Sequence, residues 1–187
     1  MNVYDFDKTI YDGNSTFDFF ISLLKKDIKL IKYPIKYFIA LILCKYNKIT
    51  REKAEETFYK FLTEIEDIEL EIEKFIPRAK MKIKQFYIDI QKDNDLIISA
   101  SPFFLVNAIC NSIGIQNVIG TEINKNTGKY IDNNLYCFGD KKVLYFQKYF
   151  CNGEIDSFYS DSLSDEPLAR LSKEAYLVKK NKIMDWF

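Results

Sequence analysis

The feature that most constrains the fold is a repeated pattern in which a short apolar run stops abruptly at a polar residue. The pattern occurs at Val3-Tyr4 before Asp5, at 96–98 before Ser99, and at 155–159 before Ser160-Asp161. Two further apolar runs, 117–123 and 175–178, fit a fourth and a fifth strand. Short buried runs separated by helical stretches are typical of parallel strands. The sequence therefore predicts an α/β fold with a Rossmann-like, doubly wound parallel sheet.

A long insertion separates the first two of these strands. Residues 5–95 lie between them, whereas a simple crossover needs only about a dozen residues. Three segments of the insertion have helical patterns: 17–46, 51–62 after a Thr50 cap, and 67–92. Pro77 is expected to break or kink the last of them. We therefore expect a core domain of residues 1–13 and 93–187 and an all-helical cap of residues 14–92.

The expected topology brings distant residues together. Right-handed crossovers place the carboxyl ends of all the parallel strands along one edge of the sheet. Side chains that follow different strands are therefore expected to meet in one crevice, whatever their separation in sequence. A turn signal at Asn126-Thr127-Gly128 predicts a hairpin beside the main sheet rather than within it.

Composition excludes several kinds of active site. The chain has no histidine, which removes Ser-His-Asp, Cys-His and histidine-ligated zinc mechanisms. Its four cysteines form no C-x-x-C pair, so neither a zinc site nor a disulfide framework is expected. The 27 basic and 27 acidic residues cancel, and we expect no nucleic-acid partner. The N-terminal residues lack the pattern of a secretory signal, so we expect a cytoplasmic location.

Two carboxylates, Asp5 and Asp7, follow the first predicted strand at a spacing of two. In extended backbone both point to one face, where like-charge repulsion and desolvation are costly unless a cation is present. A hard divalent ion such as Mg²⁺ removes that cost. The alternative is a solvated turn between strand and helix, which is the commoner explanation of an isolated D-x-D pair.

A second carboxylate pair, Asp161 and Asp165, follows another predicted strand. The four-residue spacing places both on one side of an opening helical turn, where the helix dipole favours acids. Capping of the helix alone explains one of these acids. Two acidic clusters at equivalent strand ends favour a shared metal ion.

Ser99 and Lys142 are candidates for binding an anion. Ser99 ends a predicted strand, and Pro102 at the start of the next helix leaves neighbouring backbone N–H groups free to face a phosphate. Lys142 can bring a positive charge into the crevice. Each has a plainer explanation, because a serine there is often only a helix cap and a lysine in a first helical turn is usually solvated.

In their order along residues 5–165, these pieces resemble the motifs of the haloacid dehalogenase-like (HAD) superfamily: D-x-D-x-T, a serine after a strand, a lysine, and D-x-x-x-D. The resemblance implies a HAD core with an inserted helical cap. It also implies Mg²⁺, held by the carboxylates of Asp5 and Asp161 and by the backbone carbonyl of Asp7. Supporting positions are then Thr9, Ala100 and Asp165.

The same resemblance assigns the chemistry. Asp5 is the expected nucleophile, and Asp7 is expected to protonate the leaving oxygen and later to activate water. Ser99 and Lys142 are expected to bind the phosphoryl oxygens. Lys142 is preferred to Lys141 because an apolar helix face follows it. Since a carboxylate forms a labile acyl phosphate, and since dehalogenases lack an acid at the position of Asp7, a phosphatase is expected.

The insertion after the first motif resembles the phosphoserine-phosphatase-like branch. Asn14 stands where an acidic residue is expected to grip the amine of phosphoserine, which argues against that substrate. A closer resemblance is to the phosphatidylglycerophosphatase C family of bacterial lipid-phosphate phosphatases. The resemblance is carried by 158–162 with Pro167-Leu168, by 137–139 ahead of Lys142-Val143, and by 99–102 with Leu105-Val106.

The first helical segment of the cap is basic and amphipathic. Such helices lie on anionic membranes, and its longest apolar run, 37–44, is too short to span one. The alternative is a cap that pairs with itself, because 52–73 is acidic and the apolar stripe can face inward. One helix face holds Lys25, Lys29, Lys32 and Lys36, and another holds Ile28, Ile31, Ile35, Ile39 and Ile42.

Several functions remain open at this point. The leading one is a phosphatase acting on a lipid phosphate, such as phosphatidylglycerophosphate, at the inner face of the membrane and without a transmembrane span. The alternatives are a phosphatase of a small soluble ester (phosphoserine-like or sugar phosphate), a non-catalytic magnesium-binding module, and a membrane-surface protein whose basic helix matters more than its crevice. The sequence predicts no oligomeric state.

Overall fold

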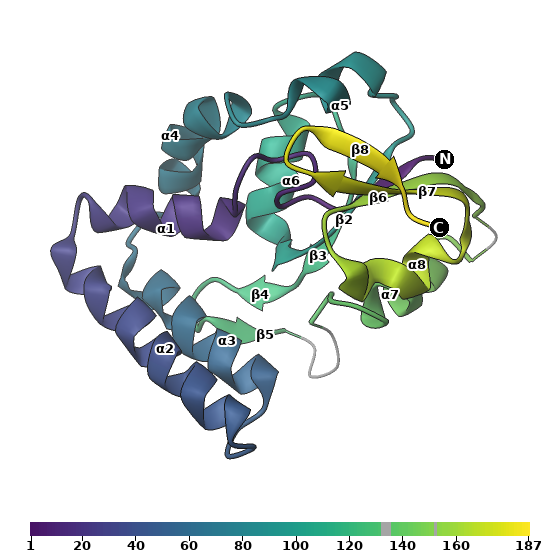
Figure 1. Ribbon diagram of the computed structural model, residues 1–187. Coiled ribbons are helices and arrows are strands. Elements are labelled where there is room, and N and C mark those ends of the chain that lie inside the picture. The colour runs from purple at the N-terminus through teal and green to yellow at the C-terminus, as the bar shows by residue number, and fades with distance from the viewer. Residues whose placement is uncertain (132–135, 152) are drawn as a thin grey trace.

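The computed structural model describes residues 1–131, 136–151 and 153–187. A six-stranded sheet in the order β3-β2-β1-β6-β7-β8 lies at its centre, with helices on both faces (Figure 1). All neighbouring pairs are parallel except β7 and β8. The predicted doubly wound α/β fold is confirmed. The strands are β1 (Val3–Tyr4), β2 (Leu96–Pro102), β3 (Asn117–Thr121), β6 (Ile155–Ser160), β7 (Ser172–Lys179) and β8 (Lys182–Asp185).

The central position of β1 determines which side chains meet. Tyr4 pairs with Ile97 of β2 on one side and with Tyr159 of β6 on the other. The residues that follow these strands therefore share one edge of the sheet. The predicted hairpin forms outside this sheet as β4 (Ile123–Asn124) and β5 (Lys129–Tyr130).

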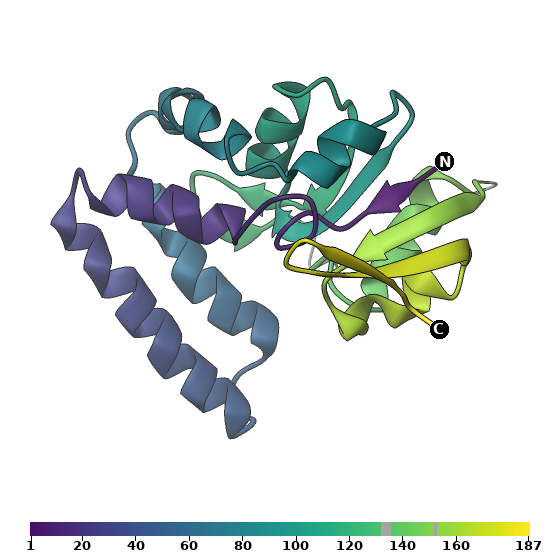
Figure 2. The same cartoon turned by 45° about the horizontal axis from the view of Figure 1, so that its top comes forward.

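The inserted residues form a series of helices, and no helix of the described residues is long and apolar enough to cross a membrane. Helices α2 and α3 pack together as a pair that projects from the rest of the molecule (Figure 2). By contrast, α4 packs against α6 beside the sheet. The insertion contains α1 (Ser15–Leu24), η1 (Ile28–Ile31), α2 (Lys32–Lys45), α3 (Arg51–Tyr59), η2 (Lys60–Glu64), α4 (Ile68–Lys80) and α5 (Gln85–Ile90). The later helices are α6 (Phe103–Asn111), α7 (Lys141–Tyr149), η3 (Leu163–Asp165) and α8 (Glu166–Ala169).

Two predicted helices have different limits in the structure. The helix expected over 17–46 is interrupted after Leu24, because Asp27 caps η1 by accepting a hydrogen bond from the Lys29 N–H at 2.9 Å. The expected break at Pro77 does not occur, since α4 continues through it to Lys80. The helical stretch breaks later, where the Lys84 N–H donates to the Ile10 carbonyl at 2.8 Å and so ties the chain to the loop after β1.

Hydrophobic side chains form two buried clusters, one on each side of the sheet. The first extends from Tyr4 of β1 through α1 to Phe58 and Phe61 of the insertion. The second lies under α7 and α8, and Trp186 packs on it with its ring 6.0 Å from that of Phe158. Because the first cluster is continuous from sheet to insertion, the domain division at 14–92 stays a prediction.

Candidate active site

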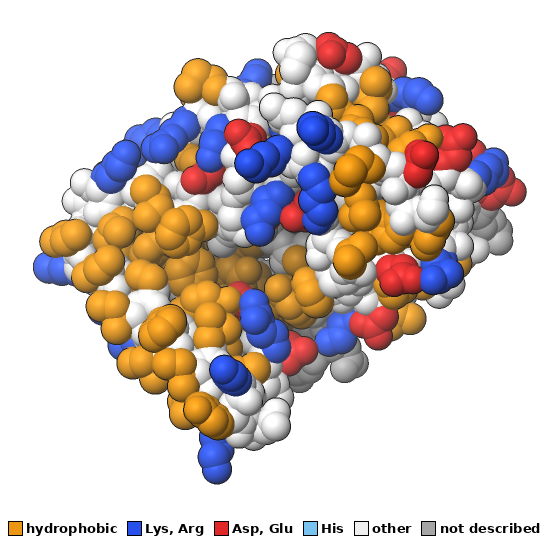
Figure 3. Space-filling model, in the orientation of Figure 1, with side chains coloured by type: hydrophobic (Ala, Val, Ile, Leu, Met, Phe, Trp, Pro, Cys, Tyr) orange, Lys and Arg blue, Asp and Glu red, His pale blue; other side chains and the backbone are white. Residues whose placement is uncertain are grey.

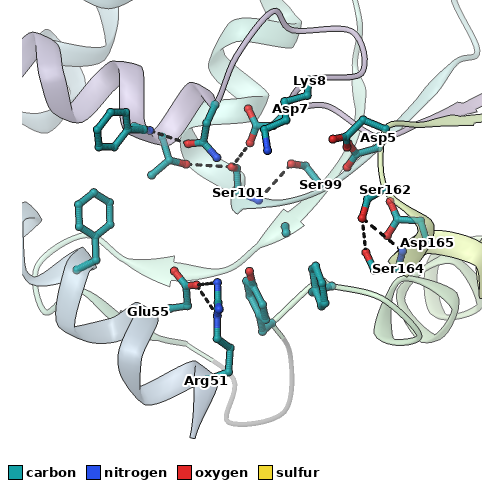
Figure 4. A pocket seen from close by; sticks show the side chains of 18 of the residues that line it. Asp5, Asp7, Lys8, Arg51, Glu55, Ser99, Ser101, Ser162, Ser164 and Asp165 are labelled. Atoms are coloured by element: carbon teal, nitrogen blue, oxygen red, sulfur yellow. Dashed lines mark hydrogen bonds and ion pairs between the residues drawn. The ribbon is translucent and has the colours of Figure 1, made fainter. Parts of the chain in front are cut away.

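A cavity of about 530 Å³ opens between the carboxyl end of the sheet and the α2–α3 pair. Figure 4 shows that Asp5 and Asp7 lie across this cavity from Arg51 and Glu55 of α3. The structure therefore brings most of the residues chosen from the sequence to one wall of a single cavity. Those that line it are Asp5, Asp7, Ser99, Ala100, Lys142, Asp161 and Asp165.

Asp5 is held at both of its carboxylate oxygens. Oδ1 lies 2.7 Å from Lys142 Nζ, and Oδ2 accepts a hydrogen bond from Thr9 Oγ1 at 3.0 Å. The residue is 7% exposed. This burial raises the pKa of Asp5 to about 7, against the opposing effect of the Lys142 ammonium. Asp5 is thus a fixed, electrostatically stressed carboxylate that still faces the cavity.

Asp7 is held by two serines. The Ser15 N–H donates to Oδ1 at 2.6 Å, and the Ser101 hydroxyl donates to Oδ2. Burial raises the pKa of Asp7, and these two hydrogen bonds oppose the rise. A carboxyl group with a raised pKa is suited to donate a proton.

Ser101 was not among the predicted site residues. It bonds to Asp7 and also accepts from Thr16 Oγ1 at 3.0 Å. The missed signal is the S-x-S spacing, because alternate residues of a strand share a face. Strand β2 runs on to Pro102, so Ser99 lies within it rather than at its end. Ser99 is 1% exposed and accepts from the Ser101 N–H at 3.1 Å.

Lys142 lies between two buried carboxylates. Its Nζ is 2.7 Å from Asp5 Oδ1 and 2.7 Å from Asp165 Oδ2, and Ser160 Oγ also donates to Asp165 Oδ2 at 2.7 Å. Burial alone favours the neutral amine, but the two carboxylates outweigh it and raise the pKa of Lys142. Lys141 points elsewhere and pairs with Glu52 at 3.3 Å. Lys142 is thus the lysine of this pair that reaches the cavity.

Asp161 has a carboxylate with no protein partner among the described residues. Its N–H donates to Thr9 Oγ1 at 2.9 Å and its carbonyl accepts from Lys179. Partial burial raises the pKa of this carboxylate, although Lys8 and Lys179 oppose the rise. A cation beside Asp161 is therefore electrostatically favoured.

The donor set fits magnesium better than a tightly caged metal. In the described ranges, no group of three His, Cys, Asp or Glu side chains is placed to hold a metal ion. Asp5 and Asp161 instead offer two carboxylates beside backbone carbonyls at the edge of the cavity. Mg²⁺ is typically bound by one or two carboxylates together with water and substrate phosphate.

The loop after β1 is constrained at both ends. Lys8 has a left-handed backbone, with φ at 61°, and its N–H donates to the Gly13 carbonyl at 2.9 Å. Its carbonyl accepts from the ammonium of Lys84, which is 7% exposed. These contacts fix the turn that carries Asp7.

The opposite wall of the cavity carries a charged pair that was not predicted from the sequence. Arg51 lies 2.7 Å from Glu55, and Glu55 accepts a hydrogen bond from the Tyr37 hydroxyl at 2.7 Å. Nothing in the sequence connects these residues to the motifs, because they approach Asp5 only through the packing of α2 and α3 over the sheet.

Known proteins resemble this chain in sequence. A family model described as haloacid dehalogenase-like hydrolase matches residues 3–170. A histidinol-phosphatase of Neisseria meningitidis serogroup C is 26% identical over 154 residues, which are 77% of this chain and 66% of that protein. The chain therefore spans just under two thirds of the length of this relative.

Solved structures resemble it in fold. A protein of unknown function from Bordetella pertussis Tohama I has a TM-score of 0.74 at 18% identity, covering 94% of this chain and 87% of that one. A phosphoserine phosphohydrolase-like protein from Francisella tularensis subsp. tularensis SCHU S4 has a TM-score of 0.57 at 16% identity, with 94% and 86% covered. A substrate-bound phosphoserine phosphatase has a TM-score of 0.52 at 15% identity, with 92% and 82% covered. These similarities concern the fold.

Proposed function

The chain belongs to the haloacid dehalogenase-like hydrolase family, and we propose that it is a magnesium-dependent phosphatase that hydrolyses phosphomonoesters through an aspartyl-phosphate on Asp5. The observation that carries the proposal is the setting of Asp5, whose two oxygens are held by Thr9 and Lys142 at the wall of the cavity. A carboxylate oriented in this way is prepared to attack phosphorus. The histidinol-phosphatase relative supports the same reaction class.

The roles proposed for the other residues follow from their places around Asp5. As the bond from Asp5 to phosphorus forms, the bond to the leaving oxygen breaks and Asp7 donates its proton to that oxygen. Water then attacks the phosphorus and gives a proton to Asp7, which releases phosphate and restores Asp5. Ser99 and Lys142 bind the phosphoryl oxygens throughout.

Magnesium, when bound, neutralises charge on the phosphoryl group. We propose that the carboxylates of Asp5 and Asp161 and the backbone carbonyl of Asp7 hold it, with Asp165 in support. The charges around the cavity favour this proposal, because Asp5, Asp7, Asp161 and Asp165 outnumber Lys8 and Lys142 on the same wall. A phosphate dianion is repelled by such a wall unless a further cation is present.

We infer that the substrate is a lipid phosphate, such as phosphatidylglycerophosphate, and that the enzyme works as a peripheral protein at the cytoplasmic face of the membrane. The resemblance to phosphatidylglycerophosphatase C supports this inference. So does the remainder of the cavity lining, which is largely aromatic and apolar and suits a leaving group with apolar parts. These lining residues are Phe17, Pro34, Tyr37, Phe58, Tyr136 and Phe138.

A small soluble phosphomonoester is the second candidate. The Arg51–Glu55 pair favours it, because a polar leaving group that reaches across the cavity meets both charges. The histidinol-phosphatase relative makes histidinol phosphate the first such ester to test. A non-catalytic magnesium-binding module is the remaining alternative.

Phosphate release in the presence of Mg²⁺ tests these proposals. The substrates are phosphatidylglycerophosphate in mixed micelles, phosphatidic acid, phosphoserine, histidinol phosphate and a sugar phosphate. We expect turnover by the wild type, highest on a lipid, and none by Asp5→Asn or in excess EDTA. Preference for a soluble ester contradicts the lipid assignment and leaves the mechanism standing.

A trapping experiment tests the intermediate itself. Acid quenching with labelled substrate is expected to leave phosphate on the wild type that hydroxylamine removes, as expected for an acyl phosphate. Asp5→Asn is expected to carry no label, while Lys141→Ala serves as the matched control and is expected to label normally. Label that persists in Asp5→Asn would exclude Asp5 as the nucleophile.

A further inference from the structure

The cap exposes a continuous apolar surface over α1, η1 and α2 (Figure 3). Single exposed apolar residues are normal on soluble proteins, but a contiguous group of large ones marks an interaction site. We call this group the α2 apolar face, and its members are each between 42% and 71% exposed. They are Phe17, Ile28, Ile31, Ile35, Phe38, Ile39 and Ile42.

The α2 apolar face is not the face by which the helix is held. Within α2 the buried residues are Tyr33 and Ala40, and Tyr37 bonds to Glu55 of α3 on that inner side. The isoleucine stripe therefore faces outward, which decides between the two arrangements left open by the sequence. No described residue covers the stripe, so its partner is another molecule.

Positive charges adjoin the α2 apolar face. Lys25, Lys29 and Lys36 have no carboxylate within 4.0 Å among the described residues, whereas Lys26 pairs with Glu71 and Lys32 with Glu64. The acidic part of the cap thus neutralises only some of the basic residues. Unpaired lysines beside exposed isoleucine and phenylalanine are the combination that binds anionic lipid surfaces.

The same charges argue against a second copy of this chain as the partner. A symmetric contact through the α2 apolar face brings equivalent surfaces together, and so it places Lys29 and Lys36 near their own copies. Like charges at a dry interface are unfavourable. Anionic headgroups instead complement them.

We propose that the α2 apolar face is a docking surface that inserts into the interface of an anionic bilayer. This inference rests on the proposed function for its biological meaning, because a lipid phosphatase must meet its substrate at a membrane. The neighbouring side of α2 carries Pro34 and Tyr37, which line the cavity. Figure 3 shows the apolar surface continuing to the hollow of that cavity, so docking brings the mouth of the site to the lipid surface.

Vesicle flotation of the full chain tests the proposal. We expect binding to vesicles of phosphatidylglycerol and phosphatidylcholine and little binding to phosphatidylcholine alone. Ile35→Ser/Phe38→Ser is expected to weaken binding about tenfold or more, because two large apolar side chains no longer enter the interface. Lys29→Glu/Lys36→Glu is expected to weaken it by a similar factor, about fivefold or more for each charge.

The matched control is Leu70→Ser/Ile88→Ser, which removes two apolar side chains that are 43% and 50% exposed on α4 and α5. It is expected to bind vesicles as the wild type does. All three variants are expected to hydrolyse para-nitrophenyl phosphate at the wild-type rate, which shows that they are folded and separates this proposal from the phosphatase assignment.

Two results overturn the proposal. The first is a wild type that hydrolyses the soluble ester but does not float with anionic vesicles. The second is a dimer in sedimentation that Ile35→Ser/Phe38→Ser dissociates, with no vesicle binding, since a second copy then covers the face. Flotation that the apolar and charge variants abolish, in a chain that hydrolyses no ester, supports the docking surface and rejects the proposed function.

Discussion

Lys142 shows at the scale of one residue how the site is held together. It is 2% exposed and contacts two carboxylates at 2.7 Å, Asp5 and Asp165. A buried ion pair adds little net stability compared with apolar packing, but removal of one partner leaves an uncompensated buried charge. Lys142 therefore keeps two acids ionised at a place that otherwise favours their neutral forms.

We expect Lys142→Ala to lower the free energy of unfolding by about 3–5 kcal/mol near neutral pH. The control Lys141→Ala removes a partly exposed pair with Glu52 and is expected to cost less than about 1 kcal/mol. Urea unfolding in EDTA measures both. Equal losses in the two variants would contradict the structural role of Lys142.

The cost of Lys142→Ala is expected to depend on pH. Burial already raises the pKa of Asp5 to about 7, and loss of the ammonium raises it further. A carboxyl whose pKa is higher in the folded than in the unfolded state destabilises the fold as pH rises. The deficit relative to wild type is therefore expected to be small near pH 4, below the unfolded pKa, and to grow as pH rises through about 7 and beyond. A deficit that shrinks on raising the pH would refute this account.

At the scale of elements, the β4–β5 hairpin connects the sheet side of the molecule to the cap. The Tyr130 N–H donates to Glu56 of α3 at 3.3 Å. Its turn contains Gly128, with φ at +65°, and a Cβ added there would lie 2.5 Å from the Tyr59 carbonyl oxygen. The close approach of the turn to the end of α3 requires glycine at this position.

Gly128→Ala is expected to lower the free energy of unfolding by about 2 kcal/mol or more, since backbone strain and a steric clash act together. Gly114→Ala is the matched control, because Gly114 also has a positive φ, +87°, but a methyl group there would lie 3.8 Å from its nearest neighbour. That variant is expected to cost about 1 kcal/mol. Chemical denaturation compares them, and equal costs would show that the contact with Tyr59 is unimportant.

At the scale of the whole molecule, the cap and the sheet share a core. Tyr4 of β1 and Phe58 of α3 belong to one continuous buried cluster. Lys141 of α7 also bridges to Glu52 of α3. A cap that shares its core with the sheet has no separate cluster to keep it folded once the sheet is lost.

We therefore expect one cooperative unfolding transition. Trp186 is the single tryptophan and packs at the sheet, on the cluster remote from the cap, so its fluorescence reports the sheet. Far-ultraviolet circular dichroism reports chiefly the helices, many of which lie in the insertion. The two thermal curves are expected to coincide, and separate midpoints would show that the cap unfolds independently.

The fold class and the main acidic residues could be predicted because their signals are local. Abrupt ends of apolar runs at Asp5, Ser99 and Asp161 identify strands and the edge they share, since the handedness of crossovers places all these ends together. The hairpin at Gly128 could likewise be predicted from its turn residues. Strand β8 and the continuation of α4 through Pro77 depend on packing, which overrides local preference.

By itself the sequence determined the parallel sheet, the presence of a helical insertion and the chemical character of the site, because each is encoded in residue type and spacing. Only the tertiary structure decided which lysine meets Asp5, that Ser101 supports Asp7, and that Arg51 faces them across the cavity. It also decided that the isoleucines of α2 point outward. These outcomes depend on how helices pack on one another, and an amphipathic pattern defines two faces without saying which one is buried.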